Sequence, residues 1–214
     1  MTKVASLIFD LDGTLIDSSH DIAGSLNHTL KTLGLPVKSK NEVQGLVGDG
    51  VRALLIKATG RSDEEYLEKA IALFKPHYLE HCNDTTILYP GVAQILDHFK
   101  DKKKAVVSNK PHDMIQKTLR HFGIDGCFEV VLGGESTAQR KPHPEPVLLS
   151  LREMKVSPGD SVMVGDGSTD IQAGKSAGTR TCAVTYGYRD RAELERYKPD
   201  FFIDKIEDLK HIVF

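Results

Sequence analysis

Hydrophobic positions divide the chain into short apolar runs of strand length, each bounded by polar or turn-forming residues. Six such runs occur, at residues 4–9, 104–108, 128–132, 161–164, 181–185 and 201–203. Short runs that are apolar throughout are typical of parallel strands that are buried on both faces. The pattern therefore predicts a sheet of parallel strands.

Between these runs, apolar residues recur with the spacing of one helix face. The three clearest stripes are Val92, Ile95, Leu96 and Phe99; Ile115, Leu119 and Phe122, followed by Gly123; and Val147, Leu148, Leu151 and Met154. Apolar positions three and four residues apart form one side of a helix, and a glycine often follows its last turn. Strands that alternate with helices predict a doubly wound, Rossmann-like α/β sheet.

The stretch from about Ile16 to Cys82 breaks this alternation, because it carries helical patterns without intervening strands. Its stripes are Ile22, Leu26, Leu30 and Leu33; Val51, Leu54, Leu55 and Ala58; and Leu67, Ala70, Ile71 and Phe74. Ser62 and Glu65 form a capping-box pattern that opens the third helix. We expect a small all-helical cap domain at residues 16–83, a lid inserted after the first strand into a core domain of residues 1–15 and 84–214.

Composition narrows the class of protein. The 214 residues are 40% hydrophobic and 27% charged, and the net charge of −2 provides no basic surface for nucleic acid. Cys82, Cys127 and Cys182 are far apart without CxxC spacing, which favours a reducing cytoplasm over a disulfide framework or a zinc ribbon. No apolar run approaches ~18 residues, so we expect no membrane span. We expect the protein to be a monomer or a homodimer.

Polar residues follow several of the predicted strands at the point where each strand ends. They are Asp10 and Asp12 after the first strand, Ser108 and Asn109 after the second, Lys141 in the loop after the third, and Asp166 and Asp170 after the fourth. Ligands of open parallel sheets bind in the crevice at the carboxyl ends of the strands. We therefore expect these groups to converge on one site.

Four aspartates in one crevice need a compensating cation. Two like charges about 4 Å apart repel by roughly 4 kcal/mol at an effective dielectric constant near 20. A hard divalent cation with oxygen ligands, above all Mg²⁺, meets this need, and Mg²⁺ favours one or two carboxylates together with a phosphate. The chain has neither GxxxxGK[ST] nor GxGxxG, so the prediction is phosphoryl chemistry outside the common nucleotide-binding families.

The first two aspartates divide the chemistry between them. Asp10 is expected to be the nucleophile, since aspartate carboxylates form aspartyl-phosphate intermediates. Asp12, two residues on, is placed to protonate the leaving alkoxide and then to accept a proton from the attacking water. The metal would bridge Asp10, Asp166 and the phosphate.

The other groups are expected to hold the phosphoryl group. Lys141 and Mg²⁺ would balance the charge of its oxygens, and Ser108 would donate a hydrogen bond. Gly13 lets the chain turn tightly after the aspartates, and Thr14 can cap the next turn or hold a phosphate oxygen.

Four sequence motifs together resemble the phosphatase branch of the haloacid dehalogenase superfamily. They are "DLDGT" at 10–14, "SN" at 108–109, Lys141 in "RKPHP", and "GDGSTD" at 165–170, and they span nearly the whole chain. The resemblance implies that Mg²⁺ is bound by Asp10, by the backbone carbonyl of Asp12 and by Asp166, and that Asp170 orients Lys141 or a metal-bound water. Dehalogenases of this superfamily lack the second aspartate, so Asp12 argues against dehalogenation.

Within this branch, "LVGDGVRALL" at 46–55 and "YPGV" at 89–92 are similar to phosphoglycolate phosphatases. The resemblance implies that 2-phosphoglycolate, a small phosphorylated metabolite, is the substrate. Gly48 and Arg52 are candidates to meet its non-phosphate end, although the stretch around them would equally serve as a helix cap. Asn109 is a candidate for contact with the phosphate or the lid.

Related pyrophosphatases, sugar-phosphate phosphatases and phosphomutases share these motifs, and their activities stay open as alternatives. An alternative of a different class is a phosphometabolite sensor without turnover. Asp12 counts against it, because a long-lived aspartyl phosphate is poorly served by a neighbouring acid/base group.

Overall fold

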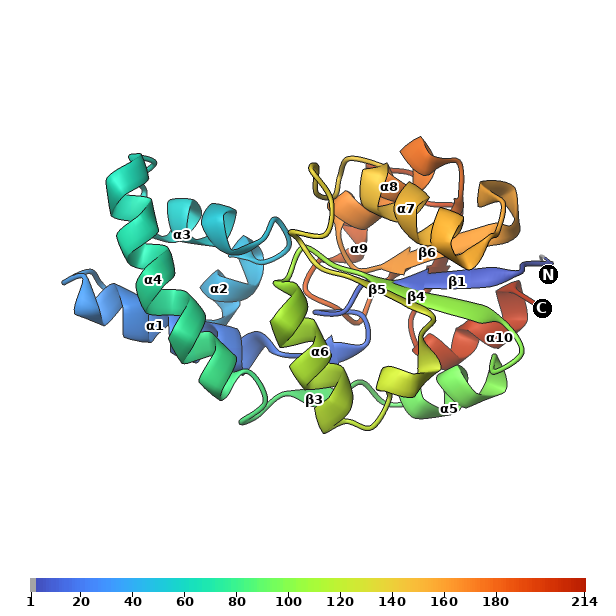
Figure 1. Cartoon of the computed structure of the whole chain (residues 1–214), viewed down its shortest axis with the longest axis horizontal. Helices are drawn as coiled ribbons and strands as arrows, with labels where there is room; N and C mark the ends of the chain where they lie inside the picture. The colour runs from blue at the N-terminus through green and yellow to red at the C-terminus, as the bar shows by residue number, and fades with distance from the viewer. Residues whose placement is uncertain (1–2) are drawn as a thin grey trace.

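The computed structural model describes residues 3–214, which form an α/β core with a helical insert at one end (Figure 1). All six predicted strands are present and pair in parallel, in the order β5-β4-β1-β6-β7-β8. The strands are β1 (Ser6–Phe9), β4 (Lys103–Val107), β5 (Val130–Leu132), β6 (Ser161–Gly165), β7 (Arg180–Val184) and β8 (Phe201–Ile203). The predicted doubly wound sheet is thus confirmed, with β1 near its centre.

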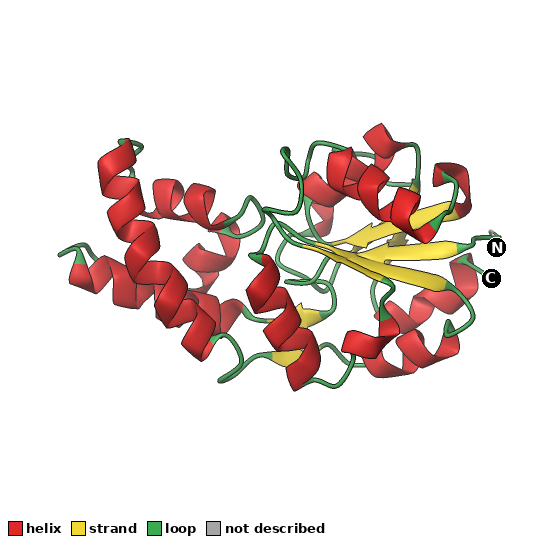
Figure 2. Ribbon diagram, viewed as in Figure 1, coloured by secondary structure: helices red, strands yellow, loops and turns green. Residues whose placement is uncertain are grey.

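Helices cover both faces of this sheet, as Figure 2 shows. Leu7 and Phe9 of β1 pack in one cluster with α5 (Val92–His98), α6 (His112–His121) and α10 (Leu209–Ile212), whereas Ile8 packs in another with α7 (Glu145–Met154) and α8 (Ser168–Ala177). Successive residues of a strand point to opposite faces, so a strand between two helical layers must be apolar at every position. This explains the continuous apolar runs.

Shorter elements complete the core. They are α9 (Arg191–Glu195) and three 3₁₀ turns at Asp125–Cys127, Pro158–Asp160 and Ile206–Asp208. The predicted apolar face of α7 is wrong at Leu148, which is 43% exposed, because the helix buries the side that carries Val147 and Leu151.

The helical insert consists of α1 (Ser19–Thr32), α2 (Lys40–Leu46), α3 (Val51–Thr59) and α4 (Glu64–His81). It has a hydrophobic cluster of its own, to which the core contributes Met114 of α6. The capping box predicted at Ser62 is wrong, since α4 begins one residue later with Asp63 as its N-cap. A capping box does open α2, at Ser39 and Glu42, where no helix was predicted.

Two short strands connect the insert to the core. β2 (Ile16–Asp17) pairs antiparallel with β3 (Ile87–Leu88), so the expectation of a strand-free stretch from Ile16 is wrong at its first two residues. Two-residue strands are too short to leave a periodic signal in a sequence. The domain boundaries at residues 16 and 83 stay a prediction. Across residues 3–214, no helix is both long enough and apolar enough to span a membrane.

Candidate active site

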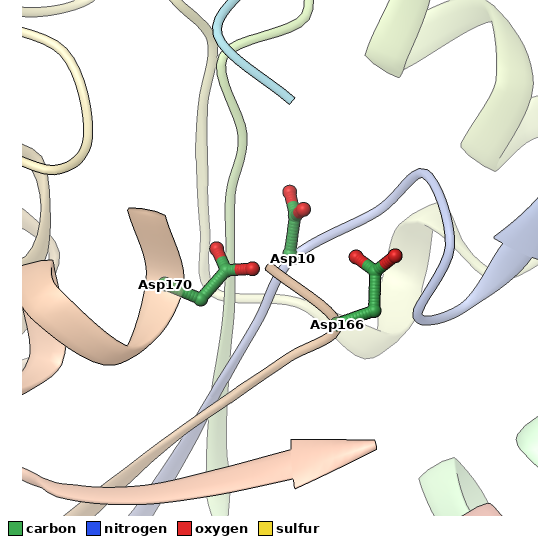
Figure 3. A group of neighbouring side chains, drawn as sticks. All are labelled: Asp10, Asp166 and Asp170. Carbon is green, nitrogen blue, oxygen red and sulfur yellow. The ribbon is translucent and has the colours of Figure 1, made fainter. Parts of the chain in front are cut away.

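Three carboxylates meet where the central strands of the sheet end. Asp10 follows β1, Asp166 follows β6, and Asp170 lies in the first turn of α8. One carboxylate oxygen from each lies within 4.8 Å of those of the other two, and Figure 3 shows the three side chains around one space. Parallel pairing of β1 and β6 in register places the two strand ends side by side. The predicted convergence of these aspartates is observed.

Lys141 is buried beside this cluster. Its Nζ donates a hydrogen bond of 2.5 Å to Asp170 Oδ1 and lies 3.0 Å from Asp10 Oδ1. The second contact is an ion pair to an oxygen that has no other partner within residues 3–214. Burial lowers the pKa of Lys141, but the two carboxylates outweigh it and raise the pKa, which keeps the ammonium charged.

Glycines leave room for the carboxylate of Asp166. A Cβ on Gly13 would lie 2.2 Å from Asp166 Oδ2, and one on Gly187 would lie 2.3 Å from Asp166 Cβ. Gly13 also has a φ of +83°, a region that other residues rarely adopt. The backbone N–H of Tyr188 donates a 2.7 Å hydrogen bond to Asp166 Oδ2. The loops after β1 and β7 thus form a cradle for this side chain.

The cluster carries more negative charge than the chain balances. Burial, together with the charges of Asp10 and Asp170, raises the pKa of Asp166 to about 8. Burial and Asp10 also raise the pKa of Asp170 to about 6, against the opposing effect of Lys141. Desolvation and like charges both disfavour the ionised form of a carboxyl group. A cation bound here would restore ionisation.

The donor set fits a hard divalent cation. Three buried carboxylates face one ammonium, which leaves two negative charges uncompensated when all are ionised. Oxygen donors in a compact group, one of them without a hydrogen bond, are the ligands that Mg²⁺ prefers.

Asp12 lies apart from the cluster in a hydrogen-bond network of its own. Its Oδ1 accepts a 2.8 Å bond from Lys110 Nζ and a 2.5 Å bond from Ser18 Oγ. Lys110 Nζ also lies 2.6 Å from the hydroxyl of Tyr78, a residue of α4 in the insert. The hydroxyl of Tyr188 accepts a 2.9 Å bond from the Ser18 N–H.

A cavity of about 470 Å³ lies between the carboxyl edge of the sheet and the insert. Asp10, Asp12, Asp166 and Asp170 all line it. Of the predicted substrate-binding residues, the cavity wall includes Ser108, Asn109 and Gly48. Asn109 also joins the two parts of the molecule, because its Nδ2 donates 2.9 Å bonds to the carbonyls of Gly48 and Lys141.

Two predicted substrate contacts are not brought to the cavity. Thr14 is fully buried outside the cavity wall, and its carbonyl accepts a 2.9 Å bond from the Tyr186 hydroxyl. Arg52 faces away from this cavity into a second hollow, which Arg140 of the core also lines, and pairs with Glu64 and with Glu68, the latter at 3.2 Å. Neither residue lines the cavity, and their roles in substrate binding stay a prediction.

Four residues at this site were missed from the sequence. Lys110 contacts Asp12 and Tyr78, Tyr188 bonds Ser18 beside Asp12, and Arg189 donates bonds of 2.8 and 2.6 Å to the carbonyls of Gln44 and Val47 in the insert. A signal existed, since the loop after β7 reaches the same edge of the sheet as the aspartates. The polar residues after the fifth strand thus carry the same signal as those after the first four.

Comparison with known proteins gives one consistent family. The sequence profile of haloacid dehalogenase-like hydrolases matches residues 7–184. The phosphoglycolate phosphatase of Aquifex aeolicus is 40% identical over 95% of this chain and 93% of its own length. A pyrophosphatase of Bacillus cereus is 32% identical over 99% of this chain and 97% of its own length. The crystal structure of a predicted phosphoglycolate phosphatase from Haemophilus somnus superposes with a TM-score of 0.91, at 35% identity, over 99% of both chains.

Proposed function

Because the chain belongs to the haloacid dehalogenase-like hydrolases and is a phosphatase, we propose that it is a Mg²⁺-dependent phosphomonoesterase that acts on 2-phosphoglycolate through an aspartyl phosphate. One observation carries the proposal. Asp10 lines the cavity with its carboxylate beside a buried ammonium and two further carboxylates. This is the arrangement that a phosphoryl acceptor beside a cation requires.

The first half of the reaction moves the phosphoryl group to the protein. An oxygen of Asp10 attacks phosphorus, and the bond from phosphorus to the leaving oxygen breaks with its electron pair on that oxygen. Asp12 gives this oxygen its proton, so an alcohol leaves and Asp12 becomes a carboxylate. Lys141 balances part of the negative charge of the transferred group.

The second half restores the enzyme. A water molecule attacks the phosphorus of the aspartyl phosphate and gives one proton to the Asp12 carboxylate. The bond between Asp10 and phosphorus breaks, inorganic phosphate forms, and Asp10 is again a carboxylate. Asp170 holds Lys141 in place through their 2.5 Å hydrogen bond.

Mg²⁺ would be held by Asp10, Asp166 and the backbone carbonyl of Asp12. It would supply positive charge to the oxygens of the phosphoryl group. Asp166 is fixed for this task by the Tyr188 N–H and by the room that Gly13 and Gly187 leave.

The insert supplies the wall that faces the rest of the substrate. Gly48 lines the cavity, and α3 begins there after Gly50, a residue that offers no side-chain cap for the first turn. Free amides at a helix N-terminus favour an anionic group, such as the carboxylate of 2-phosphoglycolate. The relative from Aquifex aeolicus supports the same substrate.

Pyrophosphate is the second candidate, because the Bacillus cereus pyrophosphatase matches the chain over nearly its whole length. It is also an anion on both sides of the bond that breaks. Its leaving group, phosphate, needs less help from a proton donor than an alkoxide does.

The test is release of inorganic phosphate from a panel of 2-phosphoglycolate, pyrophosphate, sugar phosphates and nucleotides, with Mg²⁺ and with excess chelator. The proposal predicts that 2-phosphoglycolate has the highest kcat/KM and that the chelator abolishes its turnover. A higher kcat/KM for pyrophosphate would replace the substrate and keep the chemistry. Isomerisation of a sugar phosphate with little free phosphate would identify a phosphomutase.

We also propose that the enzyme works in the cytoplasm, as a monomer or homodimer. The three cysteines are free, and Cys82 and Cys182 are buried. Free thiols are typical of proteins in a reducing compartment.

A further inference from the structure

Lys110 places a buried ammonium on the carboxylate of Asp12. The side chains of Lys110 and Asp12 are only 2% and 11% exposed, and the Nζ–Oδ1 distance is 2.8 Å. Both charges are largely shielded from solvent, so each is stabilised chiefly by the other. The phosphoryl chemistry proposed above gives Asp12 a task but gives none to this lysine.

The hydrogen bonds to Asp12 all fall on one of its two oxygens. Lys110 and Ser18 both donate to Oδ1, and within residues 3–214 no group donates to Oδ2. Asp12 lines the cavity that holds Asp10. Two bonds on Oδ1 fix the rotation of the carboxyl group and leave Oδ2 as the oxygen that exchanges a proton.

The helical insert takes part in this arrangement through Tyr78. The Tyr78 hydroxyl lies 2.6 Å from Lys110 Nζ, and Lys110 Nζ lies 4.8 Å from the centre of the Tyr78 ring. Tyr78 is 3% exposed and belongs to the hydrophobic cluster of the insert. An ammonium against the face and hydroxyl of a buried tyrosine has few other positions to adopt.

We infer that Lys110 and Tyr78 are positioning residues for the proton donor, so that Asp12 is set for leaving-group protonation by a contact from the insert. The inference rests on the proposed function, in which Asp12 protonates the leaving oxygen. The ammonium also stabilises the carboxylate that remains on Asp12 once the proton has gone. Loss of Lys110 therefore slows only those reactions that need this proton.

Substrates with different leaving groups distinguish a role of Lys110 in leaving-group protonation from a role in structure or in phosphate binding. The alkoxides of 2-phosphoglycolate and of 2-hydroxyethyl phosphate are strong bases that must be protonated as they leave. The 4-nitrophenolate of 4-nitrophenyl phosphate leaves without a proton. The parameter kcat/KM covers every step up to release of this group, so it reports the first half of the reaction for all three substrates.

The experiment measures kcat/KM of the wild-type enzyme, Lys110→Met and Tyr78→Phe on these three substrates with Mg²⁺. Lys110→Met is expected to lower kcat/KM about 100-fold for both alkyl phosphates and less than about fivefold for 4-nitrophenyl phosphate. Tyr78→Phe removes one oxygen atom and is expected to cause the same selective loss, by about fivefold. It carries the test if Lys110→Met does not fold.

A matched control is Lys175→Met. Lys175 belongs to α8, lies outside the cavity and donates hydrogen bonds to the carbonyls of Tyr197 and Lys198. Its ratio of alkyl to aryl kcat/KM is expected to equal that of the wild type. An equal loss on all three substrates would overturn the inference, since a structural role or phosphate binding predicts it. A loss confined to 2-phosphoglycolate would overturn it in favour of Lys110 as the carboxylate-binding residue.

The wild-type enzyme separates the two proposals. If it turns over 2-hydroxyethyl phosphate and 4-nitrophenyl phosphate but not 2-phosphoglycolate, the proposed substrate fails while the leaving-group ratio still tests Lys110. If it turns over none of the three, the proposed function and this inference fall together.

Discussion

The helical insert contacts the core on two sides, and the two sides are built differently. On the hinge side, beside β2 and β3, the carboxylate of Asp21 at the start of α1 accepts hydrogen bonds from the backbone and hydroxyl groups of both Thr85 and Thr86. Lys117 of α6 donates to the last carbonyls of α4. These contacts tie α1 and α4, the first and last helices of the insert, to the core.

On the rim side, at the edge of the cavity, two core side chains donate hydrogen bonds to backbone carbonyls of the insert. Asn109 donates to the Gly48 carbonyl, and Arg189 donates to those of Gln44 and Val47. Carbonyl groups at a loop are readily solvated when such a bond breaks, so a rim contact costs little to open. A buried carboxylate with four donors cannot be released so cheaply.

The difference assigns separate tasks to the two sides. Hinge contacts should determine how stable the molecule is, whereas rim contacts should determine how tightly the cavity holds its ligand. Substitutions on the two sides are therefore expected to change different measurements.

The largest effect on stability is expected for Asp21→Ala on the hinge side. It leaves two backbone N–H groups and the Thr85 hydroxyl without their acceptor, whereas the Thr86 hydroxyl keeps the Cys82 carbonyl, at a cost of about 3 kcal/mol in the free energy of unfolding. Urea denaturation measures this loss. Asp63→Ala is the matched control, since Asp63 lies at the surface, where it caps α4 through a 3.2 Å bond from Tyr66 and pairs with Arg61 at 3.0 Å, and its loss should cost about 1 kcal/mol. Equal losses would show that the hinge is no firmer than an ordinary helix cap.

The same carboxylate predicts a pH dependence. Burial raises the pKa of Asp21, but the hydrogen bonds from Thr85 and Thr86 outweigh burial and lower the pKa below 3.8. A depressed pKa contributes stability that is complete above the pKa of the unfolded chain and is lost as pH falls through the folded value. The difference in unfolding free energy between wild type and Asp21→Ala should hold from pH 7 to about 5 and shrink below about 4. A difference that grows in acid would contradict this assignment.

On the rim side, Arg189→Gln is expected to raise KM for 2-phosphoglycolate about tenfold, which corresponds to ~1.4 kcal/mol. The free energy of unfolding should change by less than about 0.5 kcal/mol, because the freed carbonyls meet water. Arg191→Gln is the control, since Arg191 pairs with Glu195 at the surface. A large loss of stability with an unchanged KM would place Arg189 with the hinge contacts.

The smallest effect is expected for Lys117→Met. Lys117 neutralises the C-terminal end of α4 by bonding the carbonyls of Leu79 and Glu80 at 2.5 and 3.0 Å. Such an exposed cap is worth about 0.5–1 kcal/mol in the free energy of unfolding. Steady-state kinetics on 2-phosphoglycolate should be unchanged, and a shift in KM would show that the hinge side also tunes the cavity.

The core of the fold could be predicted because its strands are covered on both faces. Leu7, Ile8 and Phe9 must all be apolar when helices lie above and below β1, and that constraint leaves a continuous signal. The two-residue strands β2 and β3 carry no such signal, and their pairing depends on contacts between segments about seventy residues apart.

At the site, too, some features could be predicted from the sequence and others could not. The position of Asp10, Asp166 and Asp170 follows from strand ends and parallel pairing, so their convergence could be predicted. The direction of a long side chain does not follow from its position. Arg52 turns outward to two glutamates, and Lys110 turns inward to Asp12, although both are basic residues close to the cavity. Only the packing of the insert against the core decides between these outcomes.

The proposed mechanism depends on Asp10 as the phosphoryl acceptor. The most direct measurement is phosphate release from 2-phosphoglycolate by the wild-type enzyme and by Asp10→Asn, both with Mg²⁺. Asp10→Asn is expected to lose at least about 10⁴-fold in kcat, since the proposed reaction has no other acceptor. Its unfolding temperature should be unchanged or higher, because one of three crowded carboxylates is gone. A kcat within about tenfold of the wild-type value would contradict the account.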